Sequence, residues 1–200
     1  MKKIVFALIG LLITIPFFAQ DELSEKATVE KVLNIPVFIY SYPTVEFDEV
    51  TTLSATMSAL SDALSNNSEQ ISVTDKVKEI INKAKRKVKK GDIEDFDAII
   101  INPDDYSGIV IKFKDEISLQ SDVKRISNVP IYMFSYPNDK FEEVDEFSAT
   151  LSILGGGSLS DRTNEIVRKA KRREKKGKVK PFDAIIISPD DFKGILIKFN

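Results

Sequence analysis

The sequence contains no cysteine and no histidine. Without cysteine the chain has no disulfides, no thiolate metal ligands and no thiol for lipid attachment after an export signal, which excludes a lipoprotein. General-base catalysis would then depend on carboxylates, lysine or tyrosine, and nucleophilic catalysis on serine with lysine. No partner for such a group can be assigned by spacing, so we expect neither an enzyme nor a bound cofactor.

The chain also lacks a large excess of one charge and a glycine-rich phosphate loop. It carries 29 basic and 31 acidic side chains, for a net charge of −2. This balance provides no general attraction to nucleic acid, which we do not expect as a partner. The single glycine cluster, Gly155 to Gly157, lies in a segment of variable length and is not a phosphate-binding motif.

The first 19 residues have the pattern of a secretory signal. Lys2 and Lys3 precede an apolar run over residues 4–15, and Ala19 is the expected position of cleavage. The run is shorter than the roughly 20 apolar residues that a transmembrane helix needs. We therefore expect a periplasmic or secreted protein, with an uncleaved anchor as the alternative.

About 80 residues of the chain occur twice. Residues Asn34 to Met57 align without gaps to Asn128 to Leu151, and Asp75 to Phe113 align to Asp161 to Phe199. Of these 63 paired positions, 35 are identical. The sequence therefore predicts two copies of one fold.

These two copies define the expected domains. Residues 20–116 form the first predicted unit and residues 117–200 form the second. Each unit is near the lower limit of size for independent folding, because small domains bury a smaller share of their surface. Packing of the two units against each other would relieve that limit.

Each repeat begins with two predicted strands. The first is apolar and ends at a proline, PVFIYSYP at residues 36–43 and PIYMFSYP at residues 130–137. The second covers residues 47–56 and 141–150, which are rich in valine, threonine and phenylalanine. A polar segment of different length in the two repeats follows and is expected to be a surface loop.

A helix is predicted next in each repeat. Asp75 and Asp161, or the residues just before them, are the expected caps, and Gly91 and Gly177 are the expected stops. In the first repeat an apolar stripe recurs at helical spacing. The stripe consists of Val77, Ile80, Ile81, Ala84 and Val88.

Each repeat ends with two apolar runs separated by a Pro-Asp-Asp turn, the pattern of a β-hairpin. Ile99, Ile100 and Ile101 are apolar on both faces of their strand, and a helix can cover only one of these faces. The other face is expected to meet the second repeat or another subunit. The predicted class is α+β, with two tandem β-β-α-β-β repeats, each a mostly antiparallel sheet with one helix packed on it.

This order of segments resembles the YbjQ-like family of heavy-metal-binding domains and the related envelope-stress lipoprotein fold. The resemblance is carried by FDEVTTLSAT and FEEVDEFSAT, by KAKRK and KAKRR in the helices, and by FDAIII before each hairpin. It implies a small envelope domain that assembles with copies of itself. The chain departs from the family pattern at Phe96 and Phe182, where a small residue is favoured, and in its basic helix.

Two acidic pairs are candidate metal ligands. Asp104 and Asp105 in the first turn, and Asp190 and Asp191 in the second, could offer carboxylate oxygens to a hard cation such as calcium. The alternative is turn chemistry, because proline and aspartate are favoured in such loops for backbone reasons.

A basic run on each helix is the strongest charge feature and a candidate binding surface. Cations near a helix C-terminus also compensate the helix dipole, and the face opposite an apolar stripe must be polar in any case. The functional alternative is contact with anionic envelope material. The residues predicted to make that contact are Lys85, Arg86, Lys89, Lys171, Arg172 and Lys175.

Alternating aromatic residues occupy the first strand of each repeat. Tyr40 and Tyr42 are matched by Phe134 and Tyr136. Such residues could form a binding platform, although strand aromatics most often pack in a core or across strands.

The sequence as a whole predicts an exported, non-enzymatic binding or assembly module of the cell envelope or extracellular space. Its expected partners are a second copy of the chain, another envelope protein or an anionic envelope surface. The alternative is a carboxylate-based hydrolase, which would need a cleft between the repeats lined by Asp or Glu with raised pKa values.

Overall fold

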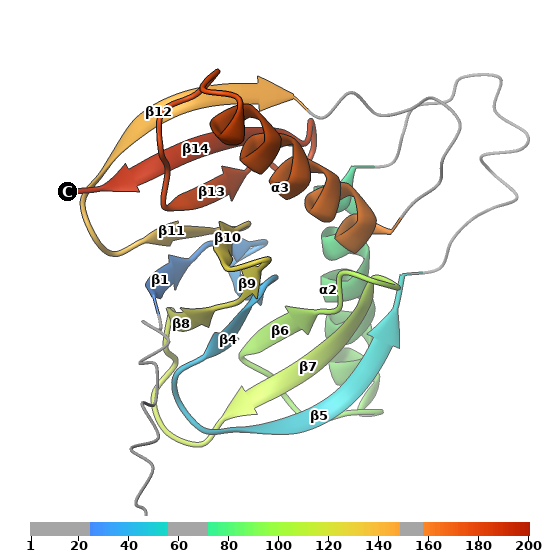
Figure 1. Ribbon diagram of the computed structural model, residues 1–200. Helices are drawn as coiled ribbons and strands as arrows, with labels where there is room; N and C mark the ends of the chain where they lie inside the picture. The colour runs from blue at the N-terminus through green and yellow to red at the C-terminus, as the bar shows by residue number, and fades with distance from the viewer. Residues whose placement is uncertain (1–24, 56–71, 149–157) are drawn as a thin grey trace, which may run out of the picture.

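A computed structural model describes residues 25–55, 72–148 and 158–200 of the chain (Figure 1). The expected signal segment and most of the predicted variable loop lie outside these residues. The described part is an α+β structure with three sheets and two helices. The helices are α2 (Val73–Lys90) and α3 (Leu159–Lys175).

Three sheets form the β part of the fold. The strands before residue 116 are β1 (Lys26–Val29), β2 (Lys31–Val32), β3 (Ile35–Phe38), β4 (Ser41–Pro43), β5 (Phe47–Ser54), β6 (Ala98–Ile101) and β7 (Ser107–Phe113). Those after it are β8 (Gln120–Val123), β9 (Arg125–Ile126), β10 (Val129–Tyr132), β11 (Ser135–Pro137), β12 (Phe141–Ser148), β13 (Ala184–Ile187) and β14 (Lys193–Phe199).

Two of the sheets have five strands and equivalent strand orders. One has the order β2-β3-β6-β7-β5 and the other the order β12-β14-β13-β10-β9. In each, the hairpin is antiparallel as predicted, whereas β3 pairs with β6, and β10 with β13, in parallel. A helix separates the outer strand from the hairpin along the chain in both cases.

The third sheet takes strands from both halves of the chain. Its order is β11-β1-β8-β4, and it lies between the two five-stranded sheets (Figure 1). Ala27 pairs with Ser121 at its centre, and an isolated antiparallel bridge joins Ile39 to Met133. The two members of each pair are 94 residues apart, the same offset that aligns the first parts of the two sequence repeats.

This central sheet was not predicted, because its inner strands β1 and β8 precede the segments that the sequence pattern marks as strands, as do β2 and β9 of the five-stranded sheets. The pattern β-β-α-β-β is therefore incomplete. Each half of the described chain has five strands before its helix and two after it.

Both faces of the hairpin strands are buried, each by a different layer. In β6, Ile99 and Ile101 belong to the core that includes Ile80 of α2. Ile100, on the opposite face, packs in a cluster with Val29 of the central sheet. The helix thus covers one apolar face of β6, and the shared four-stranded sheet covers the other.

The helix N-caps lie two or three residues before the predicted positions. Ser72 and Ser158 are the N-caps, and each accepts a hydrogen bond from the backbone N–H of the aspartate three residues later. These side-chain oxygens satisfy amide groups that have no partner within the helix. At the other end of α2, Gly91 is the C-cap with φ of 78°, as predicted.

The apolar first strand of each repeat is interrupted. Tyr40 has φ of 54° and Phe134 has φ of 53°, so the backbone leaves the extended conformation between β3 and β4 and between β10 and β11. The predicted strands over residues 36–43 and 130–137 are therefore wrong as continuous elements. The break sends β3 into a five-stranded sheet and β4 into the shared one.

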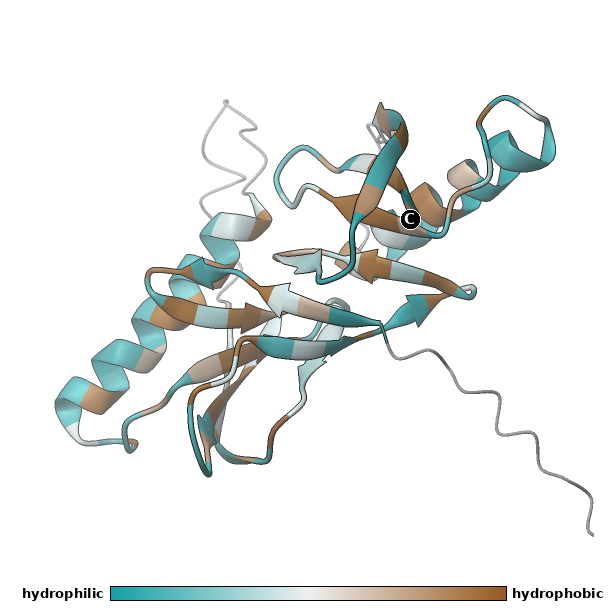
Figure 2. Ribbon diagram, turned by 90° about the vertical axis from the view of Figure 1, so that its left-hand side faces the viewer, coloured by the Kyte–Doolittle hydropathy of each residue, from teal (hydrophilic) through white to brown (hydrophobic). Residues whose placement is uncertain are grey.

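The two helices lie on the side of the molecule away from the four-stranded sheet (Figure 1). Seen from the sheet side, they extend toward opposite ends of the molecule (Figure 2). Within the described residues, neither helix is long and apolar enough to cross a membrane.

Candidate functional site

The predicted basic surface lies on the exposed side of the helices. On α2, a shallow hollow of about 450 Å³ is lined by Asn82, Lys85, Arg86 and Lys89, which share one face of the helix. Three of the six predicted binding residues therefore lie together on this face.

Two of the six predicted residues also have a structural role. Lys85 Nζ donates to the backbone carbonyl of Leu33 at 3.0 Å, and Lys171 Nζ donates to that of Ser127. Leu33 and Ser127 have φ values of 51° and 50°, so each lysine holds a tight turn between two short strands. These lysines tether the helix to its sheet.

The other four predicted residues remain exposed on the helices. Arg86 donates from Nε to the carbonyl of Asn82 within its own helix. Lys89, Arg172 and Lys175 are exposed, and none of them has an ion pair with any described residue. Their charges are therefore available to a partner.

The helices concentrate positive charge far beyond the average of the chain. α2 carries eight basic and two acidic side chains, and α3 carries seven basic and three acidic ones. Together they hold a net charge of +10 in a chain whose net charge is −2. The rest of the sequence is correspondingly acidic, and the exposed positions of β12 include Glu142 and Glu143.

The second aspartate of each pair, Asp105 or Asp191, stabilises its own turn. Asp105 accepts hydrogen bonds from the backbone N–H and the hydroxyl of Ser107, at 2.8 and 2.7 Å. These bonds lower the pKa of Asp105, and Ser188 and Lys193 similarly lower that of Asp191. Both contacts are those expected if these aspartates stabilise the turn backbone, which was the alternative to metal binding.

Asp190 has a different partner, located in the other half of the chain. Its two carboxylate oxygens accept from the backbone N–H and the hydroxyl of Thr74, at 3.1 and 3.0 Å. The described residues contain no group of three or more acidic side chains arranged to hold a metal ion. The calcium hypothesis stays a prediction.

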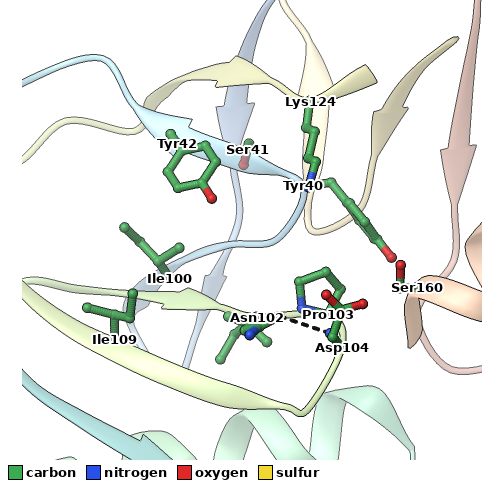
Figure 3. A pocket seen from close by; sticks show the side chains of 11 residues that line it. Tyr40, Ser41, Tyr42, Ile100, Asn102, Pro103, Asp104, Ile109, Lys124 and Ser160 are labelled. Carbon is green, nitrogen blue, oxygen red and sulfur yellow. Dashed lines mark hydrogen bonds between the residues drawn. The ribbon is translucent and has the colours of Figure 1, made fainter. Parts of the chain in front are cut away.

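A second cavity, of about 230 Å³, lies where the two halves meet (Figure 3). The first half contributes residues of β4 and of the β6–β7 turn, and the second half contributes Lys124 and Ser160. Its inner wall includes Ile100 and Ile101, and Asp104 is its single carboxylate. The lining therefore does not assemble the pair of carboxylates that a hydrolase of the predicted kind would use.

Two buried side chains that carry hydroxyl groups line this second cavity, which we call the cleft. Tyr40 is 4% exposed, and burial raises its pKa to about 12, outweighing the neighbouring hydroxyls of Thr163 and Ser160, which lower it. Ser41 is 1% exposed, and its hydroxyl has no hydrogen-bond partner among the described residues. Burial of a hydroxyl without a partner is unfavourable unless something else bonds to it.

The aromatic residues predicted as a possible platform divide into two classes. Tyr40 and Phe134 are buried, consistent with the core alternative. Tyr42 and Tyr136 are 56% and 52% exposed. Tyr42 forms part of the cleft, and Tyr136 lies beside Glu30, whose carboxylate raises the pKa of the phenol.

Sequence reasoning missed the cleft because its residues come from five separated segments. One feature of the sequence did point to the cleft: a position that is basic in one repeat and acidic in the other. Lys124 and Glu30 are 94 residues apart and occupy equivalent positions, just before the second short strand of each half.

Comparison of the chain with protein-family models, curated proteins and solved structures found no match. The resemblance to the YbjQ-like family therefore stays a prediction.

Proposed function

We propose that this protein is an exported, non-enzymatic binding module whose two basic helix faces contact an anionic surface of the cell envelope. The observation that carries the proposal is the segregation of charge. Both helices lie on one side of the molecule and hold a net charge of +10 in an otherwise acidic chain. A surface of this kind attracts phosphate or carboxylate groups presented in two dimensions.

The arrangement of the exposed cations supports this reading over dipole compensation alone. Dipole effects are confined to the last turn of a helix. Arg86 lies more than one turn from the end of α2, and the hollow on α2 begins at Asn82, whereas Arg172 lies in the last turn of α3. On α2 the basic row is therefore longer than stabilisation of a helix terminus requires.

We infer further that the two halves are copies of one unit related by an approximate twofold axis. The pairing of Ala27 with Ser121 and of Ile39 with Met133 supports this, because each residue meets its own repeat equivalent. Such an axis relates α2 to α3, so the two basic helix faces lie on the same side of the molecule. Two weak contacts joined in one rigid body bind more tightly than either alone.

The proposal is tested by co-sedimentation of the protein, without residues 1–19, with lipid vesicles. We expect binding to vesicles rich in phosphatidylglycerol, loss of binding at high salt and no binding to neutral phosphatidylcholine vesicles. Competition by a soluble acidic polysaccharide distinguishes a polysaccharide partner from a lipid one. Equal sedimentation with anionic and neutral vesicles, or none with either vesicle or polysaccharide, would refute the proposal.

A further inference from the structure

The cleft between the two halves combines a buried polar end with two opposite charges at its mouth. Tyr40 and Ser41 are at the buried end, and Lys124 and Asp104 are both exposed at the rim (Figure 3). Among the described residues, neither the Lys124 ammonium nor the Asp104 carboxylate has an ion-pair partner. The cleft therefore offers one cation and one anion to a ligand.

The remaining walls are apolar. Ile100 is buried, Ile109 is half-buried, and the ring of Tyr42 lies on the same side of the cleft (Figure 3). A volume of about 230 Å³ is below the usual range of about 300–1,000 Å³ for drug-sized ligands. The ligand must consequently be small, with a short aliphatic part.

We propose that this cleft binds an aliphatic α-amino acid, with its carboxylate at Lys124, its ammonium group at Asp104 and its side chain against Ile100 and Ile109. Charge-assisted hydrogen bonds at both ends are stronger than neutral ones and fix the orientation of the ligand. The Ser41 hydroxyl, which has no partner in the described chain, supplies a further polar contact at the buried end.

The second half of the chain contains a natural counterpart that keeps a buried serine hydroxyl without a partner, that of Ser135, but lacks the pair of free charges. Glu30 replaces the lysine, Phe134 replaces the tyrosine, and Asp190 already accepts two hydrogen bonds from Thr74. A carboxylate would meet Glu30 there and be repelled. The chain therefore has one ligand site of this kind and not two.

This counterpart also supplies substitutions to residue types that already occur at the equivalent positions of the fold. Lys124→Glu and Tyr40→Phe each introduce the residue found at the equivalent position of the other half. Glu30→Lys is the matched control, because it changes a charge at the position that the inference excludes from binding. None of these residues belongs to the basic helix surface, so vesicle binding should be unchanged and failure of either proposal can be recognised separately.

The test is a titration of the isotope-labelled protein with L-leucine, followed by NMR. We expect saturable shifts of amide signals around Ser41 and Asp104, at least tenfold weaker binding for Lys124→Glu and unchanged binding for Glu30→Lys. Two analogues identify the charges: 4-methylpentanoate lacks the ammonium group and 3-methylbutylamine lacks the carboxylate, and each should bind at least tenfold more weakly than leucine. Absence of shifts with millimolar leucine, or equal affinity of the Lys124→Glu variant, would overturn the inference.

Discussion

Asp190 caps the N-terminus of α2 from the opposite half of the chain. Its carboxylate accepts from the backbone N–H of Thr74 at 3.1 Å and from the Thr74 hydroxyl at 3.0 Å, across 116 residues of sequence. The counterpart contact is made by the backbone, where the Ser160 N–H of α3 donates to the carbonyl of Pro103 at 3.1 Å. The start of each helix is thus joined to the hairpin turn of the other half.

The first prediction follows from this asymmetry. Asp190→Ala should lower the free energy of unfolding by about 1 kcal/mol, because an amide of the first helical turn loses its acceptor. Asp104→Ala removes the equivalent side chain, which makes no such contact, and should change stability by less than half as much. Urea denaturation of both variants measures the difference, and equal losses would show that the carboxylate does not act as a cap.

The second prediction concerns two equivalent glycines. A Cβ atom at Gly108 would lie 2.7 Å from Cγ2 of Ile80, whereas one at Gly194 would lie 3.0 Å from Cγ2 of Ile166. Both contacts force a core isoleucine side chain to move, and the shorter contact at Gly108 requires the larger displacement. We expect Gly108→Ala to cost about 1–3 kcal/mol and Gly194→Ala to cost less. Thermal unfolding of the pair checks the order, and a larger loss for Gly194→Ala would contradict this packing.

The third prediction is a loss of stability at alkaline pH. Burial raises the pKa of Tyr40 from 10.0 to about 12, so the neutral phenol is favoured in the folded state. The stabilisation is complete below pH 10 and declines as the pH rises toward 12, because the unfolded chain ionises first. Tyr132 is fully buried, and its pKa is raised in the same direction by the same cause.

Variants identify the source of this pH dependence. Tyr40→Phe and Tyr132→Phe introduce the residues found at the equivalent positions, Phe134 and Phe38. Relative to the unsubstituted protein, each should lose less stability between pH 9 and pH 11.5, measured by urea denaturation at each pH. Parallel curves for all three proteins would mean that other groups, such as lysines, control alkaline unfolding.

The fourth prediction concerns the expected domain boundary. Residues 20–116 contain β1 and β4, which pair in the central sheet only with β8 and β11 of residues 117–200. Neither fragment alone should form a folded monomer, since its central strands and apolar surface lack their partners. An equimolar mixture should form a one-to-one complex, detected by native mass spectrometry. A folded monomer of either fragment would contradict this prediction.

Much of the fold follows from local sequence patterns. The periodic stripe around Ile80 and the Pro-Asp-Asp turns were sufficient to place both helices and both hairpins. The central sheet could not be predicted, because β1 is a four-residue strand stabilised by partners 92 to 110 residues away. Local pattern carries no information about such pairing.

Of the two candidate sites, one could be predicted from local sequence and the other could not. The basic surface is local to each helix, so Arg86 and Lys89 could be identified from their spacing. The cleft brings together Tyr40, Asp104, Lys124 and Ser160 through the strand break at Tyr40 and the contact between halves. No spacing in the sequence indicates these contacts.

The basic helix surface is tested most directly by comparing two variants of equal net charge. One variant replaces Arg86, Lys89, Arg172 and Lys175 with glutamine, and the other replaces Lys112 and Lys140, which lie outside the helices, with glutamate. Each basic residue near an anionic membrane contributes about 1 kcal/mol. Co-sedimentation with phosphatidylglycerol vesicles at low salt should therefore fall at least tenfold for the helix variant and remain close to that of the unsubstituted protein for the control. Equal losses for the two variants would show that only net charge matters and would contradict a binding surface on the helices.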